Sequence, residues 1–338
     1  MDKRNVCAAL AHRLGLLRIL EAGPKHNALL VLNYHRIGDQ AATPFDEGVF
    51  SATASEFEAQ VRLVQKRNGL VTLNEALNLL QNDKPFRGVP VLLTFDDGYR
   101  DNYELAFPIL RSLGAQATFF LVSSFIGTDA IPWWDKIAWL VRQSPRNKLQ
   151  LGFPTPFECN LPPGRRFVEI RSVLKHFKHS PAADAERYLS ELEDACRSAK
   201  PPSTDAPLFM TWDEARAMLK GGMAIGSHTR THRVLSQLSD EEQAQEVAQS
   251  DATLCQELGT KIETFAYPVG GRTEVTRAVR AALQERGYRA AFSYYGGVNS
   301  PGSIEPFDTR RLSVDAPTPF ARFRMRVALA ALTNGYWF

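Results

Sequence analysis

Two adjacent carboxylates, Asp96 and Asp97, follow the apolar run VPVLLTF at 89–95 and precede a glycine. Like charges side by side repel each other, and proteins tolerate such pairs mainly where a cation or a proton is shared between them. At the C-terminal end of a strand in an α/β barrel, such a pair is typical of a catalytic site. A solvated turn at Asp97 and Gly98 is the alternative interpretation of these residues.

Two histidines at metal-ligand spacing favour the catalytic interpretation. His228 and His232 stand four residues apart, directly after the β-prone run MAIGSH at 223–228. On a helical turn both imidazoles would face the same side and could reach one metal ion. Two histidines and one carboxylate with an open position are typical of a catalytic metal site rather than a structural one.

Two further strand ends carry candidate groups. In FAYPVGG at 265–271, Pro268 and the two glycines favour a turn whose backbone N–H groups could form an oxyanion hole. In VLNYHRIG at 31–38 the candidate is His35. A lone histidine is more often structural, but the neighbouring metal site favours a role for His35 in general acid–base catalysis.

Short β-prone runs alternate with helical patterns along most of the chain. The predicted strands are 28–34, 89–95, 115–122, 223–228, 262–268, 288–294 and 309–315. The predicted helices between them are 55–66, 73–80, 102–113, 211–220, 239–258 and 274–287. Several strands are apolar at successive positions, as parallel strands covered on both faces are. This alternation predicts an α/β barrel or a doubly wound sheet.

The stretch 123–210 breaks this alternation and is predicted to be a long helical insertion between two core strands. It contains WWDKIAWLV at 133–141, followed by helical patterns at 165–178 and 183–198. Trp133 and Trp134 either pack the insertion onto the barrel, which we favour, or stack against sugar rings.

The composition is that of an ordinary soluble protein. Of the 338 residues, 44% are hydrophobic and 23% are charged, so a sizeable core is expected. The net charge of +3 does not suggest a nucleic-acid partner. The four cysteines lack paired spacing, which favours reduced thiols. No apolar stretch approaches the roughly 18 residues that span a bilayer, and the N-terminal segment lacks a signal-peptide pattern. We therefore expect a cytoplasmic location.

Both ends of the chain carry basic amphipathic patterns. Residues 1–27 and 316–338 are each predicted to form an amphipathic helix beside a barrel at 28–315. The N-terminal apolar stripe is Val6, Leu10, Leu14 and Leu17, and the C-terminal one is Phe320, Phe323, Val327 and Ala331. Most such stripes face a core, and we favour helices that close the ends of the barrel. Peripheral association with the inner face of an anionic membrane is the alternative.

Together these motifs resemble those of the polysaccharide deacetylase family, the NodB-homology group of carbohydrate esterases. The T-F-D-D-G motif stands intact at 94–98, and the H-[ST]-x-x-H motif stands at 228–232. The resemblance covers residues 28–315 apart from the insertion. It implies a distorted (β/α)₇ barrel of the NodB type, a metal that is usually zinc, and hydrolysis of the N-acetyl amide of an amino sugar.

Carried over by position, the resemblance makes Asp96 the catalytic base and Asp97, His228 and His232 the metal ligands. The amide of Val269 would stabilise the oxyanion. Candidate substrate contacts are Tyr99, Tyr267, Pro268, Trp133 and Trp134.

The chain departs from the family pattern in two places. The R-x-P-Y-G motif is represented by Ala266-Tyr267-Pro268-Val269-Gly270, without its arginine, and Arg310 or Arg311 is a candidate to supply that charge. The late L-x-H motif is absent. The early Tyr34-His35-Arg36 resembles the order of a subgroup that acts on exopolysaccharides, which would make His35 the general acid.

We therefore predict a metal-dependent carbohydrate de-N-acetylase that acts in exopolysaccharide biosynthesis on a polysaccharide or its lipid-linked precursor. One alternative is a deformylase or another amide hydrolase acting on a lipid-linked or nucleotide-linked sugar. Another is a barrel that binds glycan without turnover.

Overall fold

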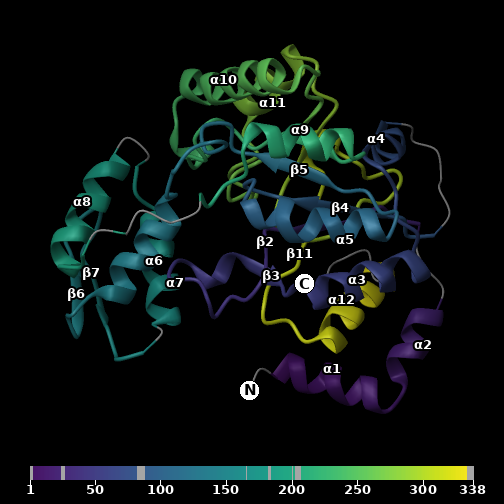
Figure 1. The fold of residues 1–338 in the computed structure, drawn as a ribbon, viewed down its shortest axis with the longest axis horizontal. Helices are drawn as coiled ribbons and strands as arrows, with labels where there is room; N and C mark the ends of the chain where they lie inside the picture. The colour runs from purple at the N-terminus through teal and green to yellow at the C-terminus, as the bar shows by residue number, and fades with distance from the viewer. Residues whose placement is uncertain are drawn as a thin grey trace.

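Seven of the apolar runs form one parallel sheet (Figure 1). The computed structural model describes residues 3–23, 27–81, 88–164, 166–181, 184–199, 201 and 207–332. The strands of the sheet are β1 (Leu30–Tyr34), β4 (Val91–Phe95), β5 (Thr118–Leu121), β8 (Ala224–Ser227), β9 (Thr264–Ala266), β10 (Ala290–Phe292) and β11 (Leu312–Ser313). Each lies within a predicted range.

The sheet curls until its two edges meet. The strand order β10-β9-β8-β5-β4-β1-β11 follows the sequence, except that β11 lies beside β1. Next to β11, Thr309 exchanges backbone hydrogen bonds with β10: its amide donates to Ala291, and the amide of Ser293 donates to it, both at 2.9 Å. The predicted (β/α)₇ barrel is confirmed.

Alternate residues of the strands face the barrel interior. An apolar layer of Val31, Leu92, Phe120 and Phe292 fills the lower part. Above it, one alternation further along β1, lies Asn33, which is buried and hydrogen-bonded to other polar groups. The barrel therefore has an apolar interior and a polar mouth at the C-terminal ends of its strands.

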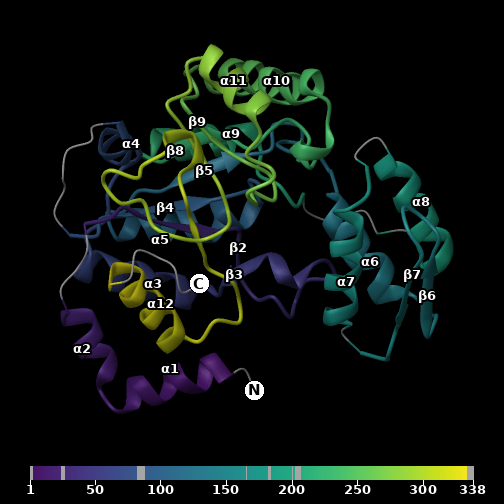
Figure 2. The ribbon, with the colours of Figure 1, turned by 180° about the vertical axis from the view of Figure 1, so that it is seen from behind.

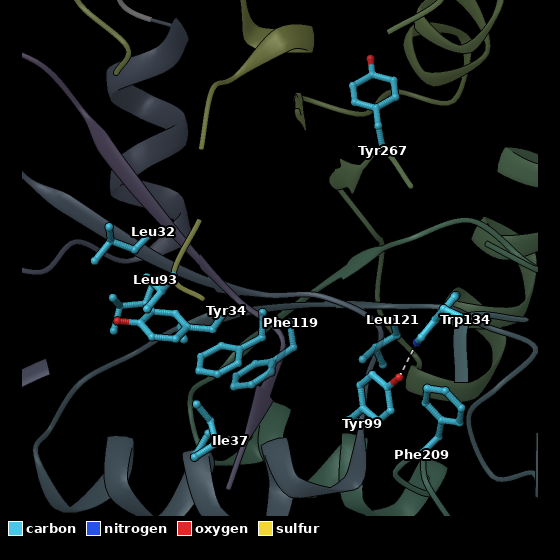
Figure 3. Packing of buried hydrophobic residues seen from close by; sticks show 14 of the residues in the cluster. Leu32, Tyr34, Ile37, Leu93, Tyr99, Phe119, Leu121, Trp134, Phe209 and Tyr267 are labelled. Carbon is cyan, nitrogen blue, oxygen red and sulfur yellow. Dashed lines mark hydrogen bonds between the residues drawn. The ribbon is translucent and has the colours of Figure 1, made fainter. Parts of the chain in front are cut away.

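The outward faces of the strands pack against the surrounding helices. Figure 3 shows Leu32, Tyr34, Leu93 and Phe119 in this layer. The ring of Tyr34 stacks on Phe95 at 5.2 Å, and its hydroxyl donates to Gln60 of the neighbouring helix at 3.0 Å. This layer fixes the strands from which the catalytic candidates project.

The barrel helices follow the predicted order. They are α3 (Ala54–Arg67), α4 (Leu73–Gln81), a π-helical turn η2 (Asn102–Ala106), α5 (Phe107–Ser112), α9 (Trp212–Lys220), α10 (Asp240–Leu258) and α11 (Arg277–Glu285). Capping boxes start α9 at Thr211 and Glu214, and α10 at Ser239 and Glu242. These pairs satisfy the first free amides of each helix, which is why the sequence marks the starts well.

The shorter elements are β2 (Arg36–Ile37), β3 (Phe50–Ala52), η1 (Glu47–Val49), η4 (Leu235–Gln237) and η5 (Pro306–Asp308).

The insertion forms a separate layer at one side of the barrel (Figures 1 and 2). Its elements are α6 (Trp133–Gln143), β6 (Lys148–Leu151), β7 (Phe157–Asn160), α7 (Phe167–Phe177) and α8 (Ala185–Cys196). Helices α7 and α8 agree with the two predicted helical patterns, and α6 contains the WWDKIAWLV run. The antiparallel pair β6–β7 was not predicted, because it lies in a segment interrupted by proline and glycine.

The chain ends form a third layer. In place of one N-terminal helix there are two, α1 (Lys3–Arg13) and α2 (Leu16–Ala22), separated at Gly15, whose φ is 74°. The C-terminal helix is α12 (Phe320–Leu332). The side chain of Ala331 and the aromatic end at 336–338 lie outside the described residues. Within the described ranges, no helix combines the length and apolar character needed to cross a bilayer.

Candidate active site

A cavity of about 170 Å³ opens at the polar mouth of the barrel. Its walls come from the strand ends on one side and from the insertion on the other. The lining residues are His35, Asp46, Val49, Asp96, Asp97, Trp133, Trp134, Arg171, Leu174, Lys178, His228, His232, Tyr267, Val269 and Tyr294. All six residues predicted to bind metal or take part in catalysis are in this set.

Asp97, His228 and His232 form a compact buried cluster, with one ligand atom of each lying within 4.8 Å of the others. Oδ1 of Asp97 is 3.5 Å from Nε2 of His228 and 3.4 Å from Nε2 of His232. Among the described residues, the same Oδ1 is buried without a hydrogen-bond partner. A buried carboxylate oxygen without a partner is costly, and a cation held between these three atoms would remove that cost.

The protonation states of the cluster also fit a metal ion. Nδ1 of His228 lies 2.8 Å from the carbonyl oxygen of Ala266, so Nδ1 donates and Nε2 is left with a free lone pair. Burial lowers the pKa of His228 to about 4 and lowers the pKa of His232 well below its usual value. Burial and the neighbouring Asp96 raise the pKa of Asp97. Neutral imidazoles and a carboxylate in need of a cation are the donor set of a Zn²⁺-type site.

A tight turn aims the carboxylate of Asp97 at the histidines. Asp97 and Gly98 both have left-handed backbones, with φ of 75° and 84°. A Cβ at position 98 would lie 2.8 Å from Ile126 and 2.9 Å from Leu121, so the turn has room only for glycine. From the sequence alone, a turn at Asp97 and Gly98 is an alternative to a catalytic site. In the structure, this turn is what positions the carboxylate of Asp97 in the site.

The two histidines do not share a helical turn, as their spacing suggested. Residues 228–234 form a loop, in which Thr229 and His232 have φ of 68° and 57°. The hydroxyl of Thr229 accepts the amide of His232 at 3.0 Å. The loop doubles back on itself and brings the rings together, with centroids 4.8 Å apart. Left-handed backbone at residues other than glycine is a form of strain that gathers at functional sites.

Glu246 of α10 anchors this loop. Its Oε2 accepts the amides of Arg230 and Thr231 at 3.0 and 2.9 Å, and its Oε1 accepts the hydroxyl of Thr231 at 2.5 Å. The side chain is buried. Sequence reasoning missed this residue, because nothing in the helical pattern of α10 distinguishes it from the other glutamates.

Asp96 has a different environment from Asp97. Arg311 donates to both of its oxygens, from Nη1 at 2.7 Å and from Nη2 at 2.8 Å, and Asn33 donates to Oδ2 at 3.1 Å. Burial alone would raise the pKa of Asp96, but Arg311, together with His228 and His35, outweighs it and holds that pKa well below its usual value. The carboxylate is therefore ionised and fixed in orientation.

Arg311 supplies the charge that the FAYPVGG segment lacks. Of the two predicted candidates, it is the fully buried one, and its Nε donates to the carbonyl oxygen of Ser293 at 2.9 Å. Arg310 instead lies over the ring of Tyr295, at 5.9 Å. Next to β11, alternate side chains face in and out, which separates the two arginines.

His35 lies beside Asp96, close to the same carboxylate oxygen that His228 approaches at 4.0 Å. Its Nε2 is 4.0 Å from Oδ2 of Asp96, and its ring meets the ring of Tyr294 edge-on at 5.5 Å. The backbone is fixed by Ser51, which accepts the His35 amide, and by Asn102, which donates to the His35 carbonyl. Burial lowers the pKa of His35, and the charge of Asp96 opposes that shift.

Val269 lines the cavity. Its φ of 62° is left-handed, and within the described part of the chain its amide makes no hydrogen bond. The carbonyl of Gly270, one residue on, accepts the amide of Tyr294 and holds the turn. An amide without a partner in a cavity-lining residue is a candidate donor to a developing oxyanion.

Comparison with known proteins agrees with this geometry. The family model described as Polysaccharide deacetylase matches residues 83–291. The chain belongs to the polysaccharide deacetylase family.

Its curated relatives include a putative polysaccharide deacetylase of Bacillus subtilis, YxkH, which is 39% identical over 103 residues. A poly-beta-1,6-N-acetyl-D-glucosamine N-deacetylase of Escherichia coli K12 is 31% identical over 107 residues. These alignments cover 29% and 31% of this chain, but only 33% and 15% of the relatives.

Solved structures share the deacetylase fold. IcaB from Ammonifex degensii has a TM-score of 0.57 at 21% identity, over 92% of this chain and 99% of that one. The Streptococcus pyogenes deacetylase PplD, in complex with acetate, has a TM-score of 0.56 at 16% identity, over 88% and 97%. At such sequence identities, these similarities show a shared fold only.

In this deacetylase fold, the two insertion tryptophans pack against the loop at 228–234. Trp134 is buried, its ring lies 4.5 Å from that of His232, and its Nε1 donates to the hydroxyl of Tyr99 at 2.7 Å. Trp133 stacks on Phe177 at 4.6 Å, and its Nε1 lies 3.4 Å from the carbonyl oxygen of His232. Both also line the cavity, so the packing interpretation agrees with their contacts and leaves part of each ring available to a ligand.

Of the three other predicted substrate contacts, only one lines the cavity. Tyr267 lines the cavity, although its hydroxyl is committed to the carbonyl of Phe307 at 2.8 Å. Pro268 is buried and does not line the cavity. Tyr99 is fully buried outside it and donates to Asp135 at 3.0 Å, as Figure 3 places it beneath Trp134. Tyr99 and Pro268 are therefore corrected from substrate contacts to parts of the frame.

Several cavity residues had no sequence signal. Arg171, Leu174 and Lys178 come from α7 of the insertion and its C-terminal end, and Asp46 comes from the loop before β3. Arg171 is ion-paired with Asp46, whereas Lys178 makes no ion pair within the described ranges. Only the folded insertion brings these groups to the barrel mouth.

Proposed function

We propose that this deacetylase-family chain hydrolyses the N-acetyl amide of an amino sugar with a divalent metal of the zinc type, and releases acetate. The substrate would be a polysaccharide or its lipid-linked precursor. One observation carries the proposal: three metal-type ligands lie together around a carboxylate oxygen that has no hydrogen-bond partner among the described residues, next to a second carboxylate bound by an arginine. Family membership supports the reaction class.

The metal would be held by Asp97, His228 and His232. When bound there, a divalent ion lowers the pKa of water and polarises an amide carbonyl. The rest of the chemistry falls to the chain's own groups. Asp96 is ionised, lines the same cavity and lies 4.0 Å from Nε2 of His228, so it would take the proton of the attacking water.

Two further groups would act on the tetrahedral species. The amide of Val269 would donate a hydrogen bond to its oxyanion. His35 would protonate the leaving nitrogen, because an amine that leaves without a proton is a poor leaving group. Burial lowers the pKa of His35 and the charge of Asp96 only partly opposes this shift, so the ring is not held as a permanent cation.

Product analysis separates this proposal from its alternatives. The metal-loaded protein should release acetate, with one free amine per acetate, from N-acetylated amino-sugar oligomers or a lipid-linked acetamido sugar. Formate from a formamido sugar, without acetate, would favour a deformylase. Binding of the oligomers by fully metal-loaded protein, with no product from any of them, would favour a glycan-binding barrel.

A further inference from the structure

The two N-terminal helices expose a row of large apolar side chains to solvent. Val6, Leu10 and Leu14 follow one another at intervals of four residues and are 41%, 56% and 64% exposed. Leu16 and Ile19 continue the row on α2 at 46% and 68%. These five residues within 14 positions are the apolar face. Contiguous apolar side chains on a surface are typical of an interaction site, whereas scattered ones need no explanation.

This apolar face is not the side of the helices that packs against the rest of the protein. The inward side of the same helices is already in use, since Ala8 and Leu17 are buried. The sequence stripe that included Leu17 with Leu10 and Leu14 is therefore split: Leu17 packs inward, and the other members point outward. Amphipathic helices that only close a barrel would bury their large residues instead.

The apolar face is bordered by positive charge. Lys3, Arg4, Arg13 and Arg18 are all exposed, and residues 3–20 contain no carboxylate. Glu21, which follows, is bound to Arg324 of α12 and to Arg67. Apolar side chains edged by cations have the chemistry of a helix that lies in the interface of an anionic bilayer.

The helices are fixed to the barrel through α12, which lies beside them in both views (Figures 1 and 2). Phe323 and Val327 of α12 are buried. Arg324 binds both oxygens of Glu21 at 2.8 Å, and Arg322 donates to Asn5 at 3.0 Å. The apolar face is thus presented by a packed layer, so binding would not have to fold it first.

We propose that the α1–α2 layer seats the protein on an anionic lipid surface, with the apolar face inserted and the four basic residues against the headgroups. A second copy of the chain is the competing occupant. A two-fold interface through this face would bring like-charged borders together, which disfavours it. The proposed binding of the α1–α2 layer to a membrane does not rest on the proposed function.

Hydrogen bonds also connect α12, which packs against the α1–α2 layer, to the cavity. Tyr294 lines the cavity and donates to Asp315 at 3.2 Å, and Ser313 donates to the same carboxylate at 2.8 Å. Arg326 of α12 donates to Ser313 at 3.4 Å. This series places α12 at the Tyr294 side of the barrel mouth. Together with the proposed function, it favours a lipid-linked glycan over a soluble polymer as the substrate.

Vesicle flotation tests membrane binding by the α1–α2 layer without any substrate. The full chain should float with vesicles of phosphatidylcholine and phosphatidylglycerol at low salt, and much less with phosphatidylcholine alone or at high salt. Leu14→Gln with Ile19→Gln should reduce the partition coefficient by roughly tenfold or more, because two inserted side chains are lost. Arg13→Gln with Arg18→Gln should weaken only the binding to anionic vesicles.

Val168→Gln is the matched control, since Val168 is 69% exposed, like Ile19, but lies on α7 of the insertion. It should float as the parent does. All variants should keep the parent melting temperature and its turnover of a soluble acetamido sugar. Failure of the parent to float at low salt, or equal losses in Val168→Gln, would overturn the proposal. A change from dimer to monomer in Leu14→Gln with Ile19→Gln, without lipid binding by the parent, would assign the face to a second copy.

Discussion

Asp96 and Asp97 are neighbours in sequence, yet the fold gives them opposite properties. Arg311 and Asn33 supply three hydrogen bonds to Asp96. Oδ1 of Asp97 has no hydrogen-bond partner in the described part of the chain and faces two imidazoles. The pKa of the first is lowered and that of the second is raised, from the same starting residue. Two titratable groups whose environments push their pKa values apart are a mark of divided catalytic roles.

The first prediction at this scale concerns Arg311. Arg311→Met removes the cation that lowers the pKa of Asp96, so that pKa should rise. A base must be ionised to accept a proton, and the acid limb of the kcat/KM profile should therefore move to higher pH. Arg311→Lys keeps the charge without the two-pronged contact and should move the limb less. An unchanged acid limb in a folded, metal-loaded Arg311→Met protein would contradict the role of Arg311.

The second prediction concerns His35. His35→Ala should lower kcat on an N-acetyl sugar by about 10²–10⁴-fold, the usual cost of losing a general acid. On an aryl acetate, whose leaving group needs no proton, the loss should be much smaller. Rates on both substrates with the same enzyme preparation provide the comparison. Equal losses would show that His35 acts through structure and not through its proton.

At the scale of elements, the site depends on two turns that a helix or strand pattern does not describe. The loop at 228–234 needs left-handed backbone at Thr229 and His232, and the turn after β4 needs it at Asp97. Glu246 holds the first of these through three hydrogen bonds from a neighbouring helix. Such anchors position metal ligands without touching the metal.

The third prediction tests this anchor. Glu246→Gln preserves the size of the side chain but loses the charge-assisted acceptor, so the loop should hold its histidines less firmly. We expect the metal dissociation constant to rise about 10–100-fold, as for other residues behind metal ligands. Titration with a chromophoric chelator measures it. Glu241→Gln, on the exposed side of α10, is the matched control and should bind metal as the parent does. Equal metal affinities in the parent, Glu246→Gln and Glu241→Gln would show that Glu246 does not support the metal site.

The regular elements could be predicted because their signals are local. Apolar runs located all seven strands, and the capping boxes at Thr211 and Ser239 marked helix starts. The path from His228 to His232 could not be predicted, since spacing alone fits a helical turn and a folded loop equally well. The choice between Arg310 and Arg311 required knowing which face of β11 points inward. Arg171 reaches the cavity only through the tertiary fold of the insertion.

At the scale of the whole molecule, a buried cluster joins the insertion to the barrel. Asp135 of α6 accepts the hydroxyl of Tyr99 and the amide of Asp46, each at 3.0 Å. Trp134 donates to the same tyrosine hydroxyl. The cavity lies between the two layers that this cluster connects, so its shape depends on the junction.

The fourth prediction uses the titration of this junction. Burial raises the pKa of Asp135 to about 7. Between pH ~4 and that pKa, the folded state holds a proton that the unfolded chain releases, so this group makes the protein less stable as pH rises, by at most ~1.4 kcal/mol per unit. Asp135→Asn removes that dependence. Urea unfolding should show the variant gaining stability relative to the parent from pH 5 to pH 8. A difference that stays constant with pH would contradict the assignment.

The central claim is that one cavity binds a metal through Asp97, His228 and His232 and uses Asp96 as its base. Acetate release from an N-acetylated amino-sugar oligomer, measured together with bound zinc for the parent and for Asp96→Asn, tests it most directly. We predict near one equivalent of zinc in both proteins, acetate from the parent that stops on chelation and returns with zinc, and about 10²–10⁴-fold less from Asp96→Asn. Undiminished acetate release by zinc-loaded Asp96→Asn, or by the chelated parent, would contradict it.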